Sequence, residues 1–154
     1  MVSRLCLSIN LFICTLSYSQ VDATIRRRQF NLDRETALQG YDAVSYFNKK
    51  PLKGDKSLIY KNLGVDYYFA NSANLNLFKS NPDKYEPAFG GWCAYAMGDN
   101  GTKVEVDPET FKIINGKLYL FYNFYFNNTL KKWNINELEL KSKAEKNWNN
   151  LIIK

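Results

Sequence analysis

The chain has 154 residues, of which 45% are hydrophobic and 23% charged, and its formal net charge is +6. This length suits one domain that buries its own core, and the composition excludes a disordered protein. The lysines are scattered instead of forming a stripe, which argues against a nucleic-acid partner. The sequence contains no histidine, so catalytic triads and metal sites that depend on imidazole are excluded.

The first 20 residues have the pattern of a secretory signal peptide. One basic residue, Arg4, precedes the mostly apolar stretch 5–16, and Ser17 and Ser19 offer small residues where a signal peptidase reads the chain. The apolar stretch is too short for a membrane span. We therefore expect residues 1–20 to be removed from a secreted or periplasmic protein that has no membrane span. The net charge then falls from +6 to +5, because Arg4 leaves with the signal peptide.

The remaining chain divides into a polar segment and a domain in which helix and strand signals follow one another closely. Residues 21–36 are predicted to be a flexible leader, and residues 37–152 an ordered domain. The elements expected in this domain are a helix over 42–47, strands over 58–61 and 65–69, a helix over 72–80, strands over 104–106, 111–114 and 117–121, a short helix within 123–133, and a C-terminal helix.

The clearest local signal is Asn115-Gly116 between two β-rich runs, which favours a tight hairpin turn. Asp42 and Ser72 are expected to cap the helices that follow them. The C-terminal helix is marked by an apolar stripe at helical spacing: Leu140, Ala144, Trp148 and Leu151. Together these signals predict an α+β fold, a small antiparallel sheet built from hairpins, with helices packed on one face and a C-terminal helix.

Cysteine usage is the most informative count in the sequence. Cys6 and Cys14 lie in the predicted signal peptide, so Cys93 alone remains in the exported chain and no internal disulfide is possible. A lone cysteine in an oxidising compartment is expected to be buried and inert, bound to a metal, or paired with another molecule. Cys93 is therefore the candidate centre of any chemistry.

An ordered set of motifs spans nearly all of the predicted domain: Gly40–Phe47, Asn81-Pro82 with Tyr85, Gly90–Ala96, Asp107-Pro108, Gly116–Tyr122, and Ala144 with Asn147-Trp148. This set resembles the exported, stand-alone branch of the YHS domain family. The resemblance implies a compact α+β fold and a role in binding or handling metal ions, without assigning a reaction. The family is named for a tyrosine, a histidine and a serine, and its histidine is absent here. Its cysteine carries over as Cys93.

The spacing of Cys93 and Met97 suggests a site for a soft metal. Residues four apart share one face of a helix, and a thiolate with a thioether favours soft ions, above all Cu(I). Tyr41, Asp42 and Asp107 lie in the other matching motifs and could complete the site. We therefore expect the metal ligands to come from these five residues, with copper as the favoured ion. The alternative for Met97 is a core or loop residue.

The predicted function is thus an exported, non-catalytic domain that binds a soft transition metal or a small ligand near Cys93. One alternative is a thiol-reactive redox protein that uses Cys93 alone, activated by a helix that begins after Gly90-Gly91. A second alternative is an interaction module for another exported protein, in which Cys93 is buried and inert, since free cysteine is among the most buried residue types.

Overall fold

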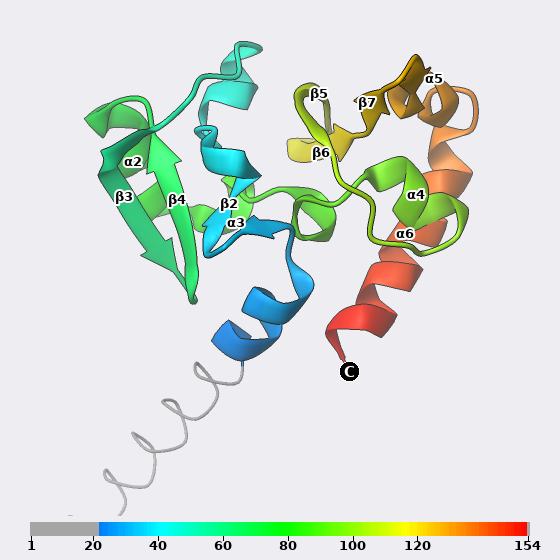
Figure 1. Ribbon diagram of the computed structural model, residues 1–154, viewed down its shortest axis with the longest axis horizontal. Coiled ribbons are helices and arrows are strands. Elements are labelled where there is room, and N and C mark those ends of the chain that lie inside the picture. Colours follow the sequence, from blue (N-terminus) through cyan, green and yellow to red (C-terminus); the bar gives the residue numbers. More distant parts are fainter. Residues whose placement is uncertain (1–21, 154) are drawn as a thin grey trace, which may run out of the picture.

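The computed structural model describes residues 22–153, so the predicted signal peptide lies outside the described residues. After a helix over residues 22–29, the elements, with 3-10 helices labelled η, are β1 (Leu32–Asp33), β2 (Thr36–Ala37), η1 (Leu38–Gly40), η2 (Ser45–Asn48), β3 (Asp55–Asn62), β4 (Val65–Phe69), α2 (Ser72–Ser80), α3 (Pro82–Tyr85), η3 (Ala88–Gly91), α4 (Ala94–Asp99), β5 (Asp107–Ile114), β6 (Lys117–Phe121), β7 (Asn123–Phe124), β8 (Asn127–Asn128), α5 (Thr129–Trp133) and α6 (Glu137–Ile152). The protein is α+β and has a C-terminal helix, as predicted (Figure 1).

The strands of the described residues form three small sheets instead of one. The four-stranded sheet has the order β1-β2-β4-β3, and its β2–β4 pair is parallel. β5 with β6, and β7 with β8, form separate antiparallel hairpins. The β5–β6 turn is the predicted Asn115-Gly116, and both residues have positive φ as a type I′ turn requires.

β6 separates two hydrophobic cores. Side chains alternate along a strand, so Leu118 and Leu120 face a first core that includes the four-stranded sheet and α2. Tyr119 and Phe121 face a second core, which is completed by the buried residues of η3, α4, α5 and α6. Figure 1 shows the same division, with β3, β4 and α2 on one side of β6 and α4 and α6 on the other. The predicted stripe of α6 faces the second core, where Leu140 is buried.

Residues 22–36 were expected to be flexible, but they form a helix and two strands that pack on the domain. Arg26 forms an ion pair with Glu86, and both side chains are largely buried. The Phe30 ring lies 5.8 Å from the Trp148 ring. Local polarity does not reveal this packing, because each partner is far away in the sequence.

The predicted strand at residues 104–106 is not a strand, and β5 begins only at Asp107. The reason is that the Val104 carbonyl accepts a hydrogen bond from the Cys93 N–H, at 2.9 Å, and so pairs with the cysteine segment instead of with a strand. In the segment 123–133, only α5 is helical, because the preceding residues form the β7–β8 hairpin.

Two predicted helix starts are displaced. α2 is capped by Asn71 instead of Ser72, and the Asn71 side chain accepts a hydrogen bond from the Asn74 N–H at 2.9 Å. The helix expected over 42–47 is the 3-10 helix η2, which begins at Ser45. The Asp42 side chain nevertheless accepts hydrogen bonds from the backbone N–H groups of Val44 and Ser45 at the start of η2, as a capping residue does.

α4 lies close to α6 at Gly98, and this contact yields a stability prediction. A Cβ atom placed on Gly98 would lie 2.4 Å from the Leu140 carbonyl oxygen. We expect Gly98→Ala to lower the free energy of unfolding by roughly 2 kcal/mol, because overpacking outweighs the helix propensity of alanine. Urea denaturation measures the change. A Gly98→Ala protein as stable as the parent would contradict this close approach.

Candidate functional site

Cys93 lies in the first core, directly before α4 and beside β6. Its backbone forms an isolated parallel bridge with Leu120. The chain reaches this position through Gly90 and Gly91, whose φ values are +59° and +88°. A Cβ on Gly90 would come within 2.8 Å of the Phe30 ring, so this turn needs glycine both for its conformation and for space.

The Cys93 thiol is fully buried and held by two polar contacts. Its Sγ lies 3.4 Å from Thr129 Oγ1 and accepts a hydrogen bond from the Tyr122 N–H, also at 3.4 Å. Thr129 Oγ1 donates its only proton to the Tyr122 carbonyl oxygen at 2.9 Å. The thiol is therefore the donor in its contact with Thr129. This arrangement suits a protonated, structural thiol that joins β6 to α5.

A pocket of about 200 Å³ opens above Cys93. Tyr95 and Tyr122 are among its lining residues, and the Lys132 ammonium lies 5.7 Å from the centre of the Tyr95 ring. Asp99 adds a carboxylate to the same lining. A cavity of roughly 150 Å³ is enough to hold benzene, so this pocket has room for a molecule with a single ring.

The structure does not bring Met97 into this pocket. Its backbone N–H donates to the Cys93 carbonyl oxygen at 3.0 Å, so the two residues lie one helical turn apart as expected. However, Cys93 caps α4 with non-helical backbone angles, φ −58° and ψ 116°, and its side chain belongs to the first core. The Met97 side chain is buried in the second core. Helical spacing places two side chains on one face only when both residues are helical.

Both carboxylate oxygens of Asp42 accept hydrogen bonds from other groups of the protein. Its Oδ1 accepts hydrogen bonds from the backbone N–H groups of Val44 and Ser45, at 2.8 and 3.3 Å. Its Oδ2 accepts from the Ala70 N–H at 2.9 Å and from the Asn74 side-chain amide at 2.7 Å. The carboxylate is completely buried. It therefore ties together η2, the end of β4 and α2, and it does not line the Cys93 pocket.

Tyr41 and Asp107 lie near each other because Glu109 links them, and neither lines the Cys93 pocket. The Tyr41 hydroxyl donates to Glu109 Oε1, and Asp107 Oδ1 accepts from the Glu109 N–H, both at 3.0 Å. Burial, and then the Glu109 carboxylate, raise the pKa of Tyr41 above its ordinary value. Asp107 Oδ2 also accepts from Thr110 Oγ1 at 2.7 Å.

The five residues expected to bind copper therefore do not converge. Among residues 22–153, no three histidine, cysteine, aspartate or glutamate side chains gather into a group that could hold a metal ion. The Cys93 pocket offers one thiol and one carboxylate, which does not fit a preformed multidentate copper site.

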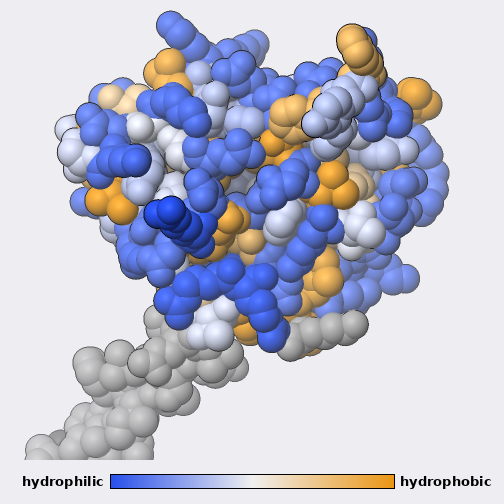
Figure 2. All heavy atoms as spheres, in the orientation of Figure 1, coloured by the Kyte–Doolittle hydropathy of each residue, from blue (hydrophilic) through white to orange (hydrophobic). Residues whose placement is uncertain are grey.

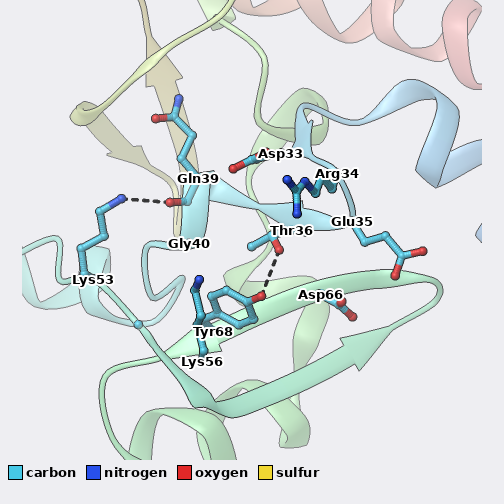
Figure 3. Close-up of a pocket in the computed structure, with 11 residues that line it drawn as sticks. Asp33, Arg34, Glu35, Thr36, Gln39, Gly40, Lys53, Lys56, Asp66 and Tyr68 are labelled. Carbon is cyan, nitrogen blue, oxygen red and sulfur yellow. Dashed lines mark hydrogen bonds between the residues drawn. The ribbon is translucent and has the colours of Figure 1, made fainter.

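A larger hollow, of about 610 Å³, lies over the four-stranded sheet (Figure 3). In it, Thr36 Oγ1 lies 3.3 Å from the Tyr68 hydroxyl, and Lys53 Nζ donates to the Gln39 carbonyl oxygen at 2.9 Å. Its lining carries balanced charges, so it favours neither anions nor cations: Asp33, Glu35 and Asp66 with Arg34, Lys53 and Lys56. Sequence reasoning missed this hollow because one wall comes from the segment interpreted as a leader.

Comparisons with protein-family models, with curated proteins and with solved structures found no significant match to this chain. The resemblance to YHS domains thus stays a prediction from the motifs. No helix within residues 22–153 is both long and apolar enough to cross a membrane.

The environment of the thiol predicts its reactivity. We expect Cys93 in the folded chain from residue 21 to react with an aromatic disulfide reagent at least about 100-fold more slowly than in urea, because the sulfur is covered. Release of the coloured thiolate measures both rates. Similar rates in the folded and unfolded chains would contradict the buried thiol and favour the thiol-reactive alternative.

The role of Asp42 can be tested separately from binding. Asp42→Ala leaves buried N–H donors without partners, and we expect it to lower the free energy of unfolding by about 3 kcal/mol or more. Asp55→Ala is the control, because Asp55 makes the same kind of turn contact with Ser57 at an exposed position. Equal unfolding midpoints in urea for the two variants would show that the Asp42 hydrogen bonds do not stabilise the fold.

Proposed function

We propose that this protein is an exported, non-catalytic binding domain that takes a small, ring-sized organic molecule into the pocket over Cys93. The observation that carries the proposal is the make-up of this pocket. It combines two tyrosines with polar and charged side chains, among them Asp99, Asn127 and Lys132, and small-molecule sites use aromatic residues with polar groups that orient the ligand.

The side chains that line the pocket indicate which class of ligand it would bind. Tyr95 and Tyr122 both line the pocket, and aromatic side chains pack well against a flat apolar body. Lys132 and Asp99 supply opposite charges at the exposed rim, and Asn127 supplies an amide. These groups suit a planar ring that carries one polar or charged substituent.

Cys93 acts in this proposal as part of the pocket floor. Its contacts with Thr129 and Tyr122 hold the N-terminus of α5 against the end of β6, and the pocket lies above this junction. The pocket lining includes no histidine that could take the thiol proton. Binding without catalysis therefore agrees with a thiol that is buried and is itself a hydrogen-bond donor.

A soft metal ion, with copper favoured, is the second candidate occupant. The observation in its favour is that the Cys93 thiol and the Asp99 carboxylate line one pocket. Binding through sulfur requires the thiol to lose its proton and its donor contact with Thr129. The separation of Met97 from the pocket weighs against this candidate.

Titration of the ¹⁵N-labelled chain from residue 21 with phenol, benzoate and benzylamine tests the proposal. We expect at least one of these probes to shift the amide signals of Tyr95, Asn127 and Thr129 in a saturable way. Thr102→Trp places a bulky side chain at the exposed edge of the pocket and should weaken that binding by at least about tenfold.

Leu77→Trp is the matched control, because Leu77 is exposed on α2 and does not line the pocket. Shifts that Thr102→Trp leaves unchanged would contradict the proposal. A parallel titration with Cu(I) against a competing chelator distinguishes the two occupants. Tight, stoichiometric copper binding that is lost in Cys93→Ser would establish the metal candidate instead.

A further inference from the structure

The β7–β8 hairpin ends in two aromatic residues that project into solvent. Tyr125 is 91% exposed and Phe126 is 111% exposed, and the neighbouring Phe124 is 42% exposed. Figure 2 shows apolar atoms standing out from the molecular outline at the end where Figure 1 labels β7. Neither tip ring is covered by any other part of residues 22–153, so the packing of the fold does not account for them.

The backbone at this tip makes the two aromatic residues still less expected. Tyr125 and Phe126 have φ values of 52° and 62°, in the left-handed region that a type I′ turn demands and that Asn-Gly adopts most readily. The β5–β6 hairpin of the same chain uses Asn115-Gly116 for this purpose, with φ values of 50° and 75°. At the β7–β8 turn, the left-handed backbone conformation is unfavourable for Tyr125 and Phe126, and so is the exposure of their rings to water. Unfavourable backbone of this kind is concentrated at functional positions.

The charged side chains in this part of the sequence are lysines. Residues 110–136 include four lysines and no acidic residue. Lys131 and Lys132 are exposed and lie in α5, which follows β8 directly, and the backbone N–H of Lys131 donates to the Asn128 side chain at the base of the hairpin. Acidic residues also lie close to this segment: Asp99 lines one pocket with Asn127 and Lys132, and Glu105 lines another with Phe124. Asp107 is hydrogen-bonded to Asn123, and Glu137 is ion-paired with Lys112. Lys131 and Lys132 are therefore the exposed lysines nearest the aromatic tip in the sequence.

We propose that the β7–β8 tip docks on an anionic phospholipid bilayer, with the Tyr125 and Phe126 rings in the headgroup region and the two lysines against lipid phosphates. Aromatic rings favour the membrane–water interface, and lysines near an anionic surface add electrostatic attraction. A bilayer accepts a projecting tip without a matching cavity, whereas a protein partner must supply one. Asn127 and Lys132 also line the Cys93 pocket, so docking brings that pocket close to the lipid.

Vesicle flotation of the chain from residue 21 tests this proposal, because that chain lacks the apolar stretch 5–16. The vesicles contain either phosphatidylcholine alone or equal parts of phosphatidylcholine and phosphatidylglycerol. Tyr125→Asn/Phe126→Gly installs the turn sequence that the β5–β6 hairpin already uses. We expect the parent to float with the anionic vesicles, and this variant to bind at least about tenfold more weakly while its thermal unfolding temperature is unchanged or higher.

Leu77→Ser, on the distant α2, removes an exposed apolar side chain and should leave flotation unchanged. Lys131→Gln should weaken binding to the anionic vesicles severalfold, and added salt should do the same. The proposal is overturned if the parent does not float with the anionic vesicles, or if Tyr125→Asn/Phe126→Gly floats equally well. Concentration-dependent self-association that this variant abolishes, without vesicle binding, would overturn it in favour of a second copy of the chain.

Discussion

The register of β6 is the constraint on which both cores and the candidate pocket depend. Its alternation sends Leu118 and Leu120 into one core and Tyr119 and Phe121 into the other. A slip of one residue would exchange the two sets, so the register is strongly specified. Because Cys93 is bridged to Leu120, the same register fixes the floor of the pocket.

What could be predicted from the sequence is mostly local. The Asn115-Gly116 turn sets the β5–β6 hairpin through contacts between near neighbours, and the stripe of α6 follows from helical spacing alone. The packing of residues 22–36 could not be predicted in this way. It depends on Arg26 meeting Glu86, 60 residues away, and on parallel pairing of β2 with β4. The sequence around Arg26 gives no local indication that this side chain pairs with the buried Glu86 carboxylate.

The candidate site shows the same limit. Cys93 was predicted to be the centre of the site, and the structure places it in the first core and in the lining of a pocket. The other expected ligands were grouped because they lie in motifs, but motif membership does not imply contact. Asp42 holds backbone N–H groups, Tyr41 and Asp107 share Glu109, and Met97 fills a core. For Met97, an indication in the sequence was the Gly90-Gly91 turn, after which Cys93 serves as a helix cap instead of a helical residue.

Crystals of the chain from residue 21, grown in turn with the ring compounds and with Cu(I), test the central claim most directly. The account predicts density for a ring between Tyr95 and Tyr122, with Cys93 Sγ still beside Thr129 Oγ1 as it is here, at 3.4 Å. A copper ion bonded to the sulfur, with Thr129 displaced, would contradict the account and restore the metal interpretation. A pocket that holds neither kind of molecule at saturating concentrations would contradict its assignment as a binding site.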